Sequence, residues 1–314
     1  MLNLYRKPHE AEDPDAVVRP TLDDLIRLNQ PAKSVELARS TARALQSGQY
    51  FSAFKGRGME FDESRPYAHG DDIRSLDWRV TARTGKVHTK LFREERERPV
   101  FLSVDLRSPM FFATRGQFKS VLATRLAALI AWSACHHGDR IGGQVFSESG
   151  STEFKPLEGH SAVLRILKGL TERAQSPDPQ QDSKHDALDQ ALNELNRHIK
   201  PGSLAFIVSD FRNLGPAGTA SLGRLARQST VVLIMLSDPI ERDLPQGLHR
   251  YGTPGEDRMI LGDEKSRRIH RERFQAREEA LRKLARGHRM RFVSGWTNEE
   301  PVRILERAFR SKPL

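Results

Sequence analysis

From residue 99 onward, apolar segments of strand length alternate with amphipathic segments of helical length. Residues 100–106 and 204–209 are continuous apolar runs, typical of strands covered on both faces, and residues 116–137 carry an apolar stripe at helical spacing. This alternation predicts an α/β domain with a mainly parallel sheet, right-handed crossovers and helices on both faces. Further strands are predicted at 140–147, 151–157, 230–236 and 291–294, and further helices at 160–174, 184–199, 217–228 and 299–310.

The first hundred residues have a different texture. Residues 1–20 are polar and contain three prolines, which favours an irregular arm. Residues 21–48 carry a Thr-x-x-Asp start and two apolar stripes, which predict two short helices. Residues 49–98 mix aromatic and β-branched residues with glycine and charge, which indicates loops and strands. The predicted organisation is an arm over 1–20, a helical then β-rich extension over 21–98, and the α/β domain over 99–314.

Composition excludes several classes of protein. The chain has 37% hydrophobic and 29% charged residues, as an ordinary globular protein has. Its longest nearly apolar run, residues 126–135, is too short to cross a bilayer. Cys135 is the only cysteine, which excludes internal disulfides and Cys-rich metal sites. Because the first residues also lack the apolar core of a secretory signal, we expect a chain that begins at its Met1, does not span a membrane and resides in the cytoplasm.

The positive charge is concentrated in one segment. The chain has 51 Lys and Arg against 41 Asp and Glu, a net charge of +10, and residues 265–291 hold 11 of the basic residues and three of the acidic ones. We expect a long solvated basic helix, and the alternatives are an acidic protein partner, a nucleic-acid backbone or an anionic membrane surface. Aromatic residues do not interleave with the basic ones, which disfavours nucleic acid. The candidate contact residues are Arg267, Arg268, Arg271, Arg282 and Lys283.

Two carboxylates follow predicted neighbouring strands. Asp105 and Asp210 each end an apolar run, and in parallel sheets the ligand crevice lies beyond the carboxyl ends of the strands. Two close carboxylates repel each other unless a cation lies between them, and oxygen ligands suit magnesium or calcium. The alternative is that each aspartate only caps the turn that follows it.

The turn after Asp105 resembles a degenerate form of the metal-ion-dependent adhesion site of von Willebrand factor A-type domains. The resemblance implies that Asp105 and Asp210 match its aspartates, whereas Arg107 and Pro109 occupy its two serine positions and Ser108 is out of phase. The guanidinium of Arg107 could neutralise both carboxylates permanently. We therefore predict no tight divalent-metal site, and we expect Arg107→Ser with Pro109→Ser to create one. The alternative hypothesis is an A-type domain that binds ligands through magnesium despite these substitutions.

A dense set of motifs fills residues 56–98. Together with the following strand it closely resembles the bacterial family called domain of unknown function 58. The resemblance implies a von Willebrand factor A-like, Rossmann-like domain and a partner or adaptor role beside MoxR-type AAA+ ATPases and other A-type domain proteins, without catalytic activity. The residues that carry it and form a candidate docking surface are Gly58, Glu60, Phe61, Arg65, Tyr67, Gly70, Asp71, Asp72, Arg74, Asp77, Trp78 and Arg83.

The same segment has a plainer interpretation. Its arginines could pair with Asp71, Asp72 and Asp77 in a polar lattice, with Trp78 as an apolar anchor beneath it, and so lock a β-rich element in place. The functional alternative is a docking surface built from the same residues. The chain has no phosphate-binding loop, no complete dinucleotide fingerprint and no His-Glu-x-x-His motif. We therefore predict a non-enzymatic interaction module without a cofactor.

Overall fold

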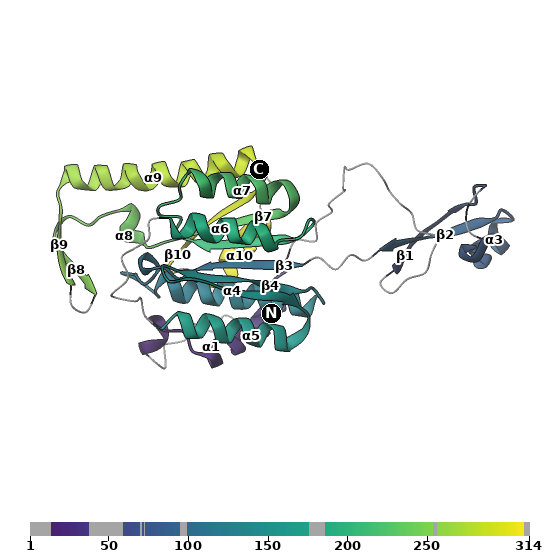
Figure 1. Cartoon of the computed structure of the whole chain (residues 1–314), viewed down its shortest axis with the longest axis horizontal. Coiled ribbons are helices and arrows are strands. Elements are labelled where there is room, and N and C mark those ends of the chain that lie inside the picture. The colour runs from purple at the N-terminus through teal and green to yellow at the C-terminus, as the bar shows by residue number, and fades with distance from the viewer. Residues whose placement is uncertain are drawn as a thin grey trace, which may run out of the picture. The chain divides into compact units, whose positions relative to one another are not determined.

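The computed structural model describes residues 14–37, 59–69, 71, 73–94, 99–175, 186–253 and 256–310. These residues fall into two compact units (Figure 1). One unit combines the residues before position 39 with those after position 97, and the other comprises residues 39–97. The larger unit is an α/β domain, and the smaller unit is a β-hairpin that carries a short helix.

The α/β unit contains a six-stranded sheet with the order β10-β7-β6-β3-β4-β5. All neighbouring pairs are parallel except β4 and β5, which are antiparallel at one edge. Numbered along the chain within this sheet, the order reads 6-5-4-1-2-3, as in Rossmann-like folds. The predicted α/β class with a mainly parallel sheet is therefore confirmed. The strands are β3 (Val100–Asp105), β4 (Ile141–Ser147), β5 (Gly150–Leu157), β6 (Leu204–Ser209), β7 (Thr230–Ser237) and β10 (Arg291–Trp296).

Helices cover both faces of this sheet (Figure 1). Alternate side chains of each central strand enter two separate cores: Val104 and Val208 pack in one core, and Phe101 and Ile207 pack in the other. Because both faces are covered, β3 and β6 are mostly apolar and buried, which is why their sequences show no alternation. Helices α4 (Lys119–His136), α5 (Gly159–Arg173) and α10 (Pro301–Arg310) line the first core, and α6 (Ala187–His198), α7 (Pro216–Gln228) and α9 (Glu264–Gly287) line the second.

The N-terminal helices belong to the α/β unit and not to the predicted extension. Helices α1 (Leu22–Arg27) and α2 (Asn29–Ala32) follow Thr21, whose side chain accepts a hydrogen bond from the backbone N–H of Asp24 at 3.2 Å. The indole of Trp132, on α4, donates to the carbonyl oxygen of Leu25 at 3.0 Å. Leu25 is fully buried in the core beside α4 and α5, so these helices form an outer layer of the larger unit.

The described end of the predicted irregular arm also packs on this unit. Residues Pro14–Val17 form a short 3-10 helix, η1. The carbonyl oxygen of Val17 accepts a hydrogen bond from the N–H of Phe118 at 2.9 Å, and that of Ala16 accepts one from Arg125 at 3.2 Å. The first 13 residues lie outside the described part of the chain.

The smaller unit contains a helix where we expected only loops and strands. Strands β1 (Met59–Pro66) and β2 (His88–Glu94) form an antiparallel hairpin, and η2 (Ile73–Ser75) and α3 (Trp78–Thr84) lie between them in sequence. The carboxylate of Asp77 caps α3 by accepting hydrogen bonds from the N–H groups of Arg79 and Val80. Gly85 ends it with a φ of 68°, a left-handed conformation that suits glycine. These caps stabilise α3 more than the β-branched residues inside the helix destabilise it.

Three elements between β7 and the basic helix complete the domain. They are α8 (Pro239–Arg242) and a hairpin of β8 (Gly247–Thr253) with β9 (Glu256–Gly262), none of which was predicted from the sequence. The basic helix itself is α9, which begins at Glu264 and ends at Gly287. Among the described residues, no helix combines the length and the apolar character that crossing a membrane requires.

Candidate functional site

The two strand-end carboxylates lie side by side, since β3 and β6 are adjacent parallel strands with Val104 opposite Val208. Asp105 is the last residue of β3, and Asp210 directly follows β6. Both side chains are fully buried. The sheet therefore brings both residues to one point, which lies inside the protein and away from solvent.

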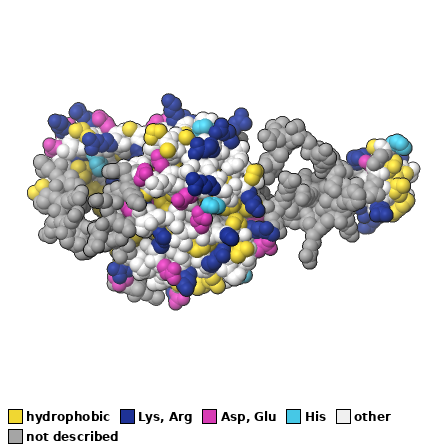
Figure 2. Space-filling model, viewed as in Figure 1, with side chains coloured by type: hydrophobic (Ala, Val, Ile, Leu, Met, Phe, Trp, Pro, Cys, Tyr) yellow, Lys and Arg dark blue, Asp and Glu magenta, His cyan; other side chains and the backbone are white. Residues whose placement is uncertain are grey.

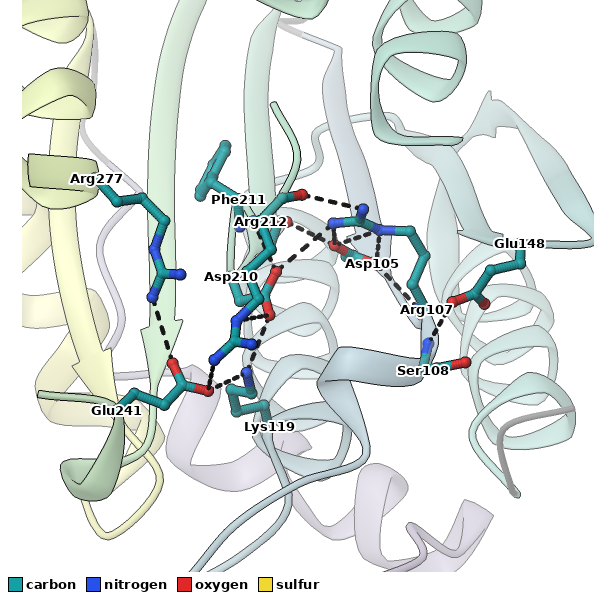
Figure 3. Close-up of polar contacts among 11 residues, drawn as sticks. Asp105, Arg107, Ser108, Lys119, Glu148, Asp210, Phe211, Arg212, Glu241 and Arg277 are labelled. Atoms are coloured by element: carbon teal, nitrogen blue, oxygen red, sulfur yellow. Dashed lines mark hydrogen bonds and ion pairs between the residues drawn. The ribbon is translucent and has the colours of Figure 1, made fainter. Parts of the chain in front are cut away.

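The guanidinium of Arg107 lies between these carboxylates (Figure 3). Its Nη2 lies 2.7 Å from Oδ2 of Asp105 and 3.6 Å from Oδ1 of Asp210, and its Nε donates to both oxygens of Asp105. Its Nη1 donates to the carbonyl oxygen of Arg212 at 3.1 Å. Only 3% of the Arg107 side chain is exposed. This arginine occupies the place where a cation would relieve the repulsion between the two aspartates.

A second buried cation lies on the other side of Asp210. Lys119, the first residue of α4, donates from Nζ to Oδ2 of Asp210 at 3.0 Å and to Oε1 of Glu241, on α8, at 2.6 Å. The Lys119 side chain is fully buried. Neither Lys119 nor Glu241 was predicted from the sequence. Charge balance could have indicated a further buried cation such as Lys119, because one arginine cannot neutralise two buried carboxylates.

The charge network continues to the surface through two more arginines. Arg212 contacts Glu241 at 3.1 Å from Nη2 and Asp210 at 3.5 Å from Nε. Arg277, on α9, contacts the other oxygen of Glu241 at 3.5 Å. Charges of opposite sign therefore alternate from β3 to the basic helix (Figure 3).

Protein donors saturate the oxygens of both aspartates. Besides Arg107, Asp105 accepts a hydrogen bond from the Ser209 hydroxyl at 2.6 Å, and Asp210 accepts one from the N–H of Arg212 at 3.0 Å. Burial raises the pKa of Asp105 above its ordinary value, and the charge of Arg107 opposes this rise. Burial alone would also raise the pKa of Asp210, but Lys119 and the other nearby donors lower it to about 2.

This geometry fits the predicted neutralisation by arginine better than a bound metal ion. A divalent cation would have to displace the guanidinium or the ammonium from oxygens that already accept short hydrogen bonds. Among the described residues, no group of three or more His, Cys, Asp or Glu side chains is arranged to hold a metal ion. In the segment before α6, Asp182 and Ser183 lie outside the described residues, and Asp186 accepts a hydrogen bond from Gln190.

The remaining residues of the predicted crevice have structural contacts. The N–H of Ser108 donates to the carboxylate of Glu148 at 2.7 Å, and Pro109 lies in the 3-10 helix η3 (Ser108–Met110). After Asp210 the backbone turns sharply, with φ of 52° at Phe211 and 61° at Asn213. A bulky residue rarely adopts such an angle, so this turn stores strain directly above the charge network.

The motif residues of the smaller unit form a local network. Arg65 pairs with Asp71 at 2.7 Å, and Asp71 also accepts a hydrogen bond from the N–H of Ala68. This backbone hydrogen bond, followed by that from Arg65, lowers the pKa of Asp71. The hydroxyl of Ser64 donates to Asp77 at 2.7 Å. The arginine pairing predicted for this segment is thus present at Asp71, whereas Asp77 accepts hydrogen bonds from a hydroxyl and from backbone N–H groups.

The anchor role predicted for Trp78 is wrong, because its side chain is 67% exposed. Arg74 and Arg83 are also exposed, and Tyr67 is half-buried. Trp78 points outward because it is the first residue of α3 and the opposite face of that helix packs on β2. Gly58, Gly70 and Asp72 lie outside the described residues, and Glu60 and Phe61 lie on β1 with side chains that are not described.

Most of the candidate residues on the basic helix have described partners. Arg271 pairs with Asp243 at 2.9 Å, and Arg282 pairs with Glu278 at 2.7 Å. Arg267 donates to the carbonyl oxygen of Leu244, and Arg268 lies 3.8 Å from Glu272. Of the five candidate residues, Lys283 alone is exposed without a described partner. These pairs favour the interpretation of α9 as a solvated helix over that of a surface for polyanions.

Comparison with known proteins gives a family match and distant structural likenesses. The family described as "Protein of unknown function DUF58" matches residues 63–284, from β1 into α9. Uncharacterized proteins of Mycobacterium tuberculosis and Mycobacterium bovis are 29% identical over 234 residues, which cover 74% of this chain and 72% of each relative.

Among solved structures, a von Willebrand factor type A protein from Catenulispora acidiphila aligns with a TM-score of 0.41 at 13% identity. That alignment covers 71% of this chain and 43% of the other chain. The conserved hypothetical protein BatB from Bacteroides thetaiotaomicron aligns with a TM-score of 0.37 at 17% identity, over 60% of this chain and 98% of the other. The residues matched by the family, 63–284, include elements of both compact units.

Proposed function

The chain belongs to the DUF58 family of proteins of unknown function, and from this membership we propose that it is a non-enzymatic protein-interaction module. The observation that carries the proposal is the buried charge network at the carboxyl ends of β3 and β6. In an α/β sheet this is the place where a ligand or substrate would bind. Here Arg107 and Lys119 fill it, with exposed side-chain fractions of 3% and 0%.

The network supports a structural role for the crevice. A catalytic carboxylate must reach a reacting atom, and a metal-dependent site must offer free oxygens to the ion. Asp105 and Asp210 direct their oxygens to fixed internal donors instead. We therefore infer that partners bind elsewhere on the surface, while the network holds the loops above the sheet in one arrangement.

We further propose that the partner is a MoxR-type AAA+ ATPase, together with other A-type domain proteins, and that the chain acts as an adaptor in the cytoplasm. The resemblance of residues 56–98 to the DUF58 motif set supports the choice of partner. The single free cysteine, Cys135, is in keeping with a reducing compartment. The adaptor would connect the ATPase to the protein complexes on which it acts.

Copurification tests this proposal. The tagged chain is expressed in its native cells together with the MoxR-type ATPase of the same genome, and the complex is isolated with a non-hydrolysable ATP analogue or with ADP present. We expect the ATPase to copurify in at least one nucleotide state. If the ATPase does not copurify with this chain in any nucleotide state, the adaptor proposal is wrong.

A further inference from the structure

The smaller unit presents an unusual share of apolar side chains to solvent. Ile73 is 69% exposed, Trp78 67% and Val87 46%. Among the described residues, the much larger α/β unit also has three exposed large apolar side chains, Leu157 at 49%, Leu164 at 40% and Leu248 at 60%. Figure 2 shows hydrophobic side chains gathered on one side of the smaller unit, with Lys and Arg side chains beside them. An exposed tryptophan is costly in water and typical of binding surfaces.

Helix α3 organises the centre of this surface. Its inner face packs on β2, where the Thr81 hydroxyl accepts a hydrogen bond from the N–H of His88 at 3.0 Å. Its outer face carries Trp78, Arg79, Ala82 and Arg83, all of which are exposed. Residues three and four apart share one face of a helix, so Trp78 lies above Ala82 and Arg79 above Arg83. We call these four residues the α3 surface.

The charge of the α3 surface is positive and lacks internal compensation. Arg79 and Arg83 make no side-chain hydrogen bond or ion pair with another described residue. The nearest described carboxylates face inward: Asp71 pairs with Arg65, and Asp77 is 6% exposed and caps the helix. Two unpaired guanidinium groups beside an exposed indole therefore complement an acidic, partly apolar ligand.

The α/β unit of the same chain also carries a net positive charge. Its residues, 1–38 and 98–314, contain 39 Lys and Arg against 32 Asp and Glu. A complementary occupant of the α3 surface must therefore bring an excess of carboxylates.

We propose that the α3 surface binds an acidic segment of a partner protein through one large apolar side chain packed on Trp78 and carboxylates paired with Arg79 and Arg83. The inference rests on the proposed function as an interaction module and identifies the surface and the chemistry of its partner. The composition is that of a binding hot spot, in which tryptophan and arginine contribute most of the binding free energy.

The size of the α3 surface favours protein over single-stranded nucleic acid. Single-stranded nucleic acids bind grooves in which several aromatic side chains stack on successive bases. Trp78 is the one exposed Trp, Tyr or Phe among the side chains described in the smaller unit. The seven residues of α3 extend for about 10 Å, which matches one or two turns of a partner helix.

Selection of peptides tests this proposal without the ATPase. A phage-displayed library of random peptides is selected on the purified full chain, and the enriched peptides are titrated by fluorescence anisotropy. We expect enrichment of peptides that combine Asp and Glu with a large apolar residue. Trp78→Ala should weaken their binding by about 30-fold, and Arg79→Gln with Arg83→Gln by about 10-fold. Circular dichroism verifies that each variant is folded.

A matched control comes from α5, where Leu164 is 40% exposed and Lys168 lies one turn further along. Leu164→Ala with Lys168→Glu should leave peptide binding unchanged. Three outcomes would overturn the proposal: no enrichment of acidic peptides, equal binding by the α3 variants, or displacement of the peptides by a single-stranded oligonucleotide. The peptide assay contains no ATPase, so a negative result in it does not contradict the adaptor proposal. Likewise, a negative copurification does not contradict peptide binding by the α3 surface.

Discussion

At the scale of single residues, the structure is governed by charges that cannot reach water. Arg107 and Lys119 are 3% and 0% exposed, and each is held between two carboxylates. A buried ion pair gains little over an apolar pair of the same shape, but a single buried charge without its partner is very unfavourable. The network therefore contributes more to specifying this one arrangement of the charged side chains than to the free energy of unfolding.

Removal of Arg107 should show how unfavourable a buried carboxylate is without its partner. We expect Arg107→Met to lower the free energy of unfolding by about 3–5 kcal/mol, because it leaves Asp105 charged and buried. Arg107→Met combined with Asp105→Asn should recover a large part of this loss. Denaturation by urea measures both variants, and equal stability of the single and double variants would contradict this expectation.

The low pKa of Asp210 predicts a loss of stability in acid. The folded pKa of about 2 lies below the ordinary value of 3.8, so the stabilisation is complete above pH 3.8 and is lost as the pH falls through 2. It amounts to about 2 kcal/mol. The difference in unfolding free energy between the wild type and Asp210→Asn, measured from about pH 5 down to pH 2, should shrink by this amount. Burial, the main cause of the raised pKa of Asp105, is present in both proteins. A constant difference would exclude the effect.

Lys119 also changes the expectation for an engineered metal site. Arg107→Ser with Pro109→Ser restores two hydroxyl groups but leaves the ammonium of Lys119 on Asp210. We now expect that double variant to bind no magnesium in a calorimetric titration, and the triple variant with Lys119→Ser to bind it. A micromolar, Asp105-dependent magnesium signal from the wild-type chain would refute this explanation.

Sequence reasoning located part of this site. The apolar runs before Asp105 and Asp210 placed both residues at strand ends. The resemblance to the metal-ion-dependent adhesion site and the charge of a guanidinium suggested that Arg107 lies between them. Lys119 was missed because it begins a helix whose apolar residues dominate the pattern. Glu241 lies far along the chain from Asp105, and contacts of that kind follow from the order of strands in the sheet, which the sequence does not specify.

At the scale of elements, long periodic segments were predictable and short capped ones were not. The strands of the α/β sheet and helices α4, α5 and α10 follow from their apolar patterns. Helix α3 depends on the capping residues Asp77 and Gly85, and its own residues favour a strand. The positive charge of α9 was visible in the sequence, but its partners Asp243 and Glu241 are distant in the chain.

Two arginines of α9 allow the effect of burial to be separated from that of distance. Arg277 lies 3.5 Å from Glu241 with 24% and 3% of the side chains exposed, and Arg271 lies 2.9 Å from Asp243 with 47% and 44% exposed. We expect Arg277→Gln to lower the unfolding free energy by about 1–3 kcal/mol and Arg271→Gln by less than about 1 kcal/mol. Thermal or urea denaturation of the two variants measures these losses. A larger effect at Arg271 would show that the shorter distance matters more.

At the scale of the whole molecule, the chain forms one discontinuous unit and one inserted unit. Residues before position 39 return to the α/β unit through Leu25 and Val35, which are buried with α4 and α5. The sequence had suggested an extension over 21–98 and an α/β domain that begins at residue 99. The sequence could not reveal this, because an amphipathic helix specifies that its apolar face is buried but not which element buries it.

This organisation predicts opposite results for two deletions. Replacement of residues 39–97 by a flexible linker of about 15 residues should leave the α/β unit folded, with cooperative thermal unfolding. Deletion of residues 1–38 should destabilise that unit by several kcal/mol, because it uncovers the surfaces that Leu25, Val35 and Leu37 bury. Calorimetry and circular dichroism compare the two proteins. If the first deletion unfolds the sheet, the division into units is wrong.

The insertion also fixes an order of events during synthesis on the ribosome. Residues 39–97 are complete before Val100, the first residue of the six-stranded sheet, has been made. The hairpin of the smaller unit can therefore form early, as units near the N-terminus do in translation. Helices α1 and α2 are made before it, yet α4 and α5, which cover them, emerge much later. Helices α1 and α2 thus remain uncovered while a complete later unit can already fold downstream of them.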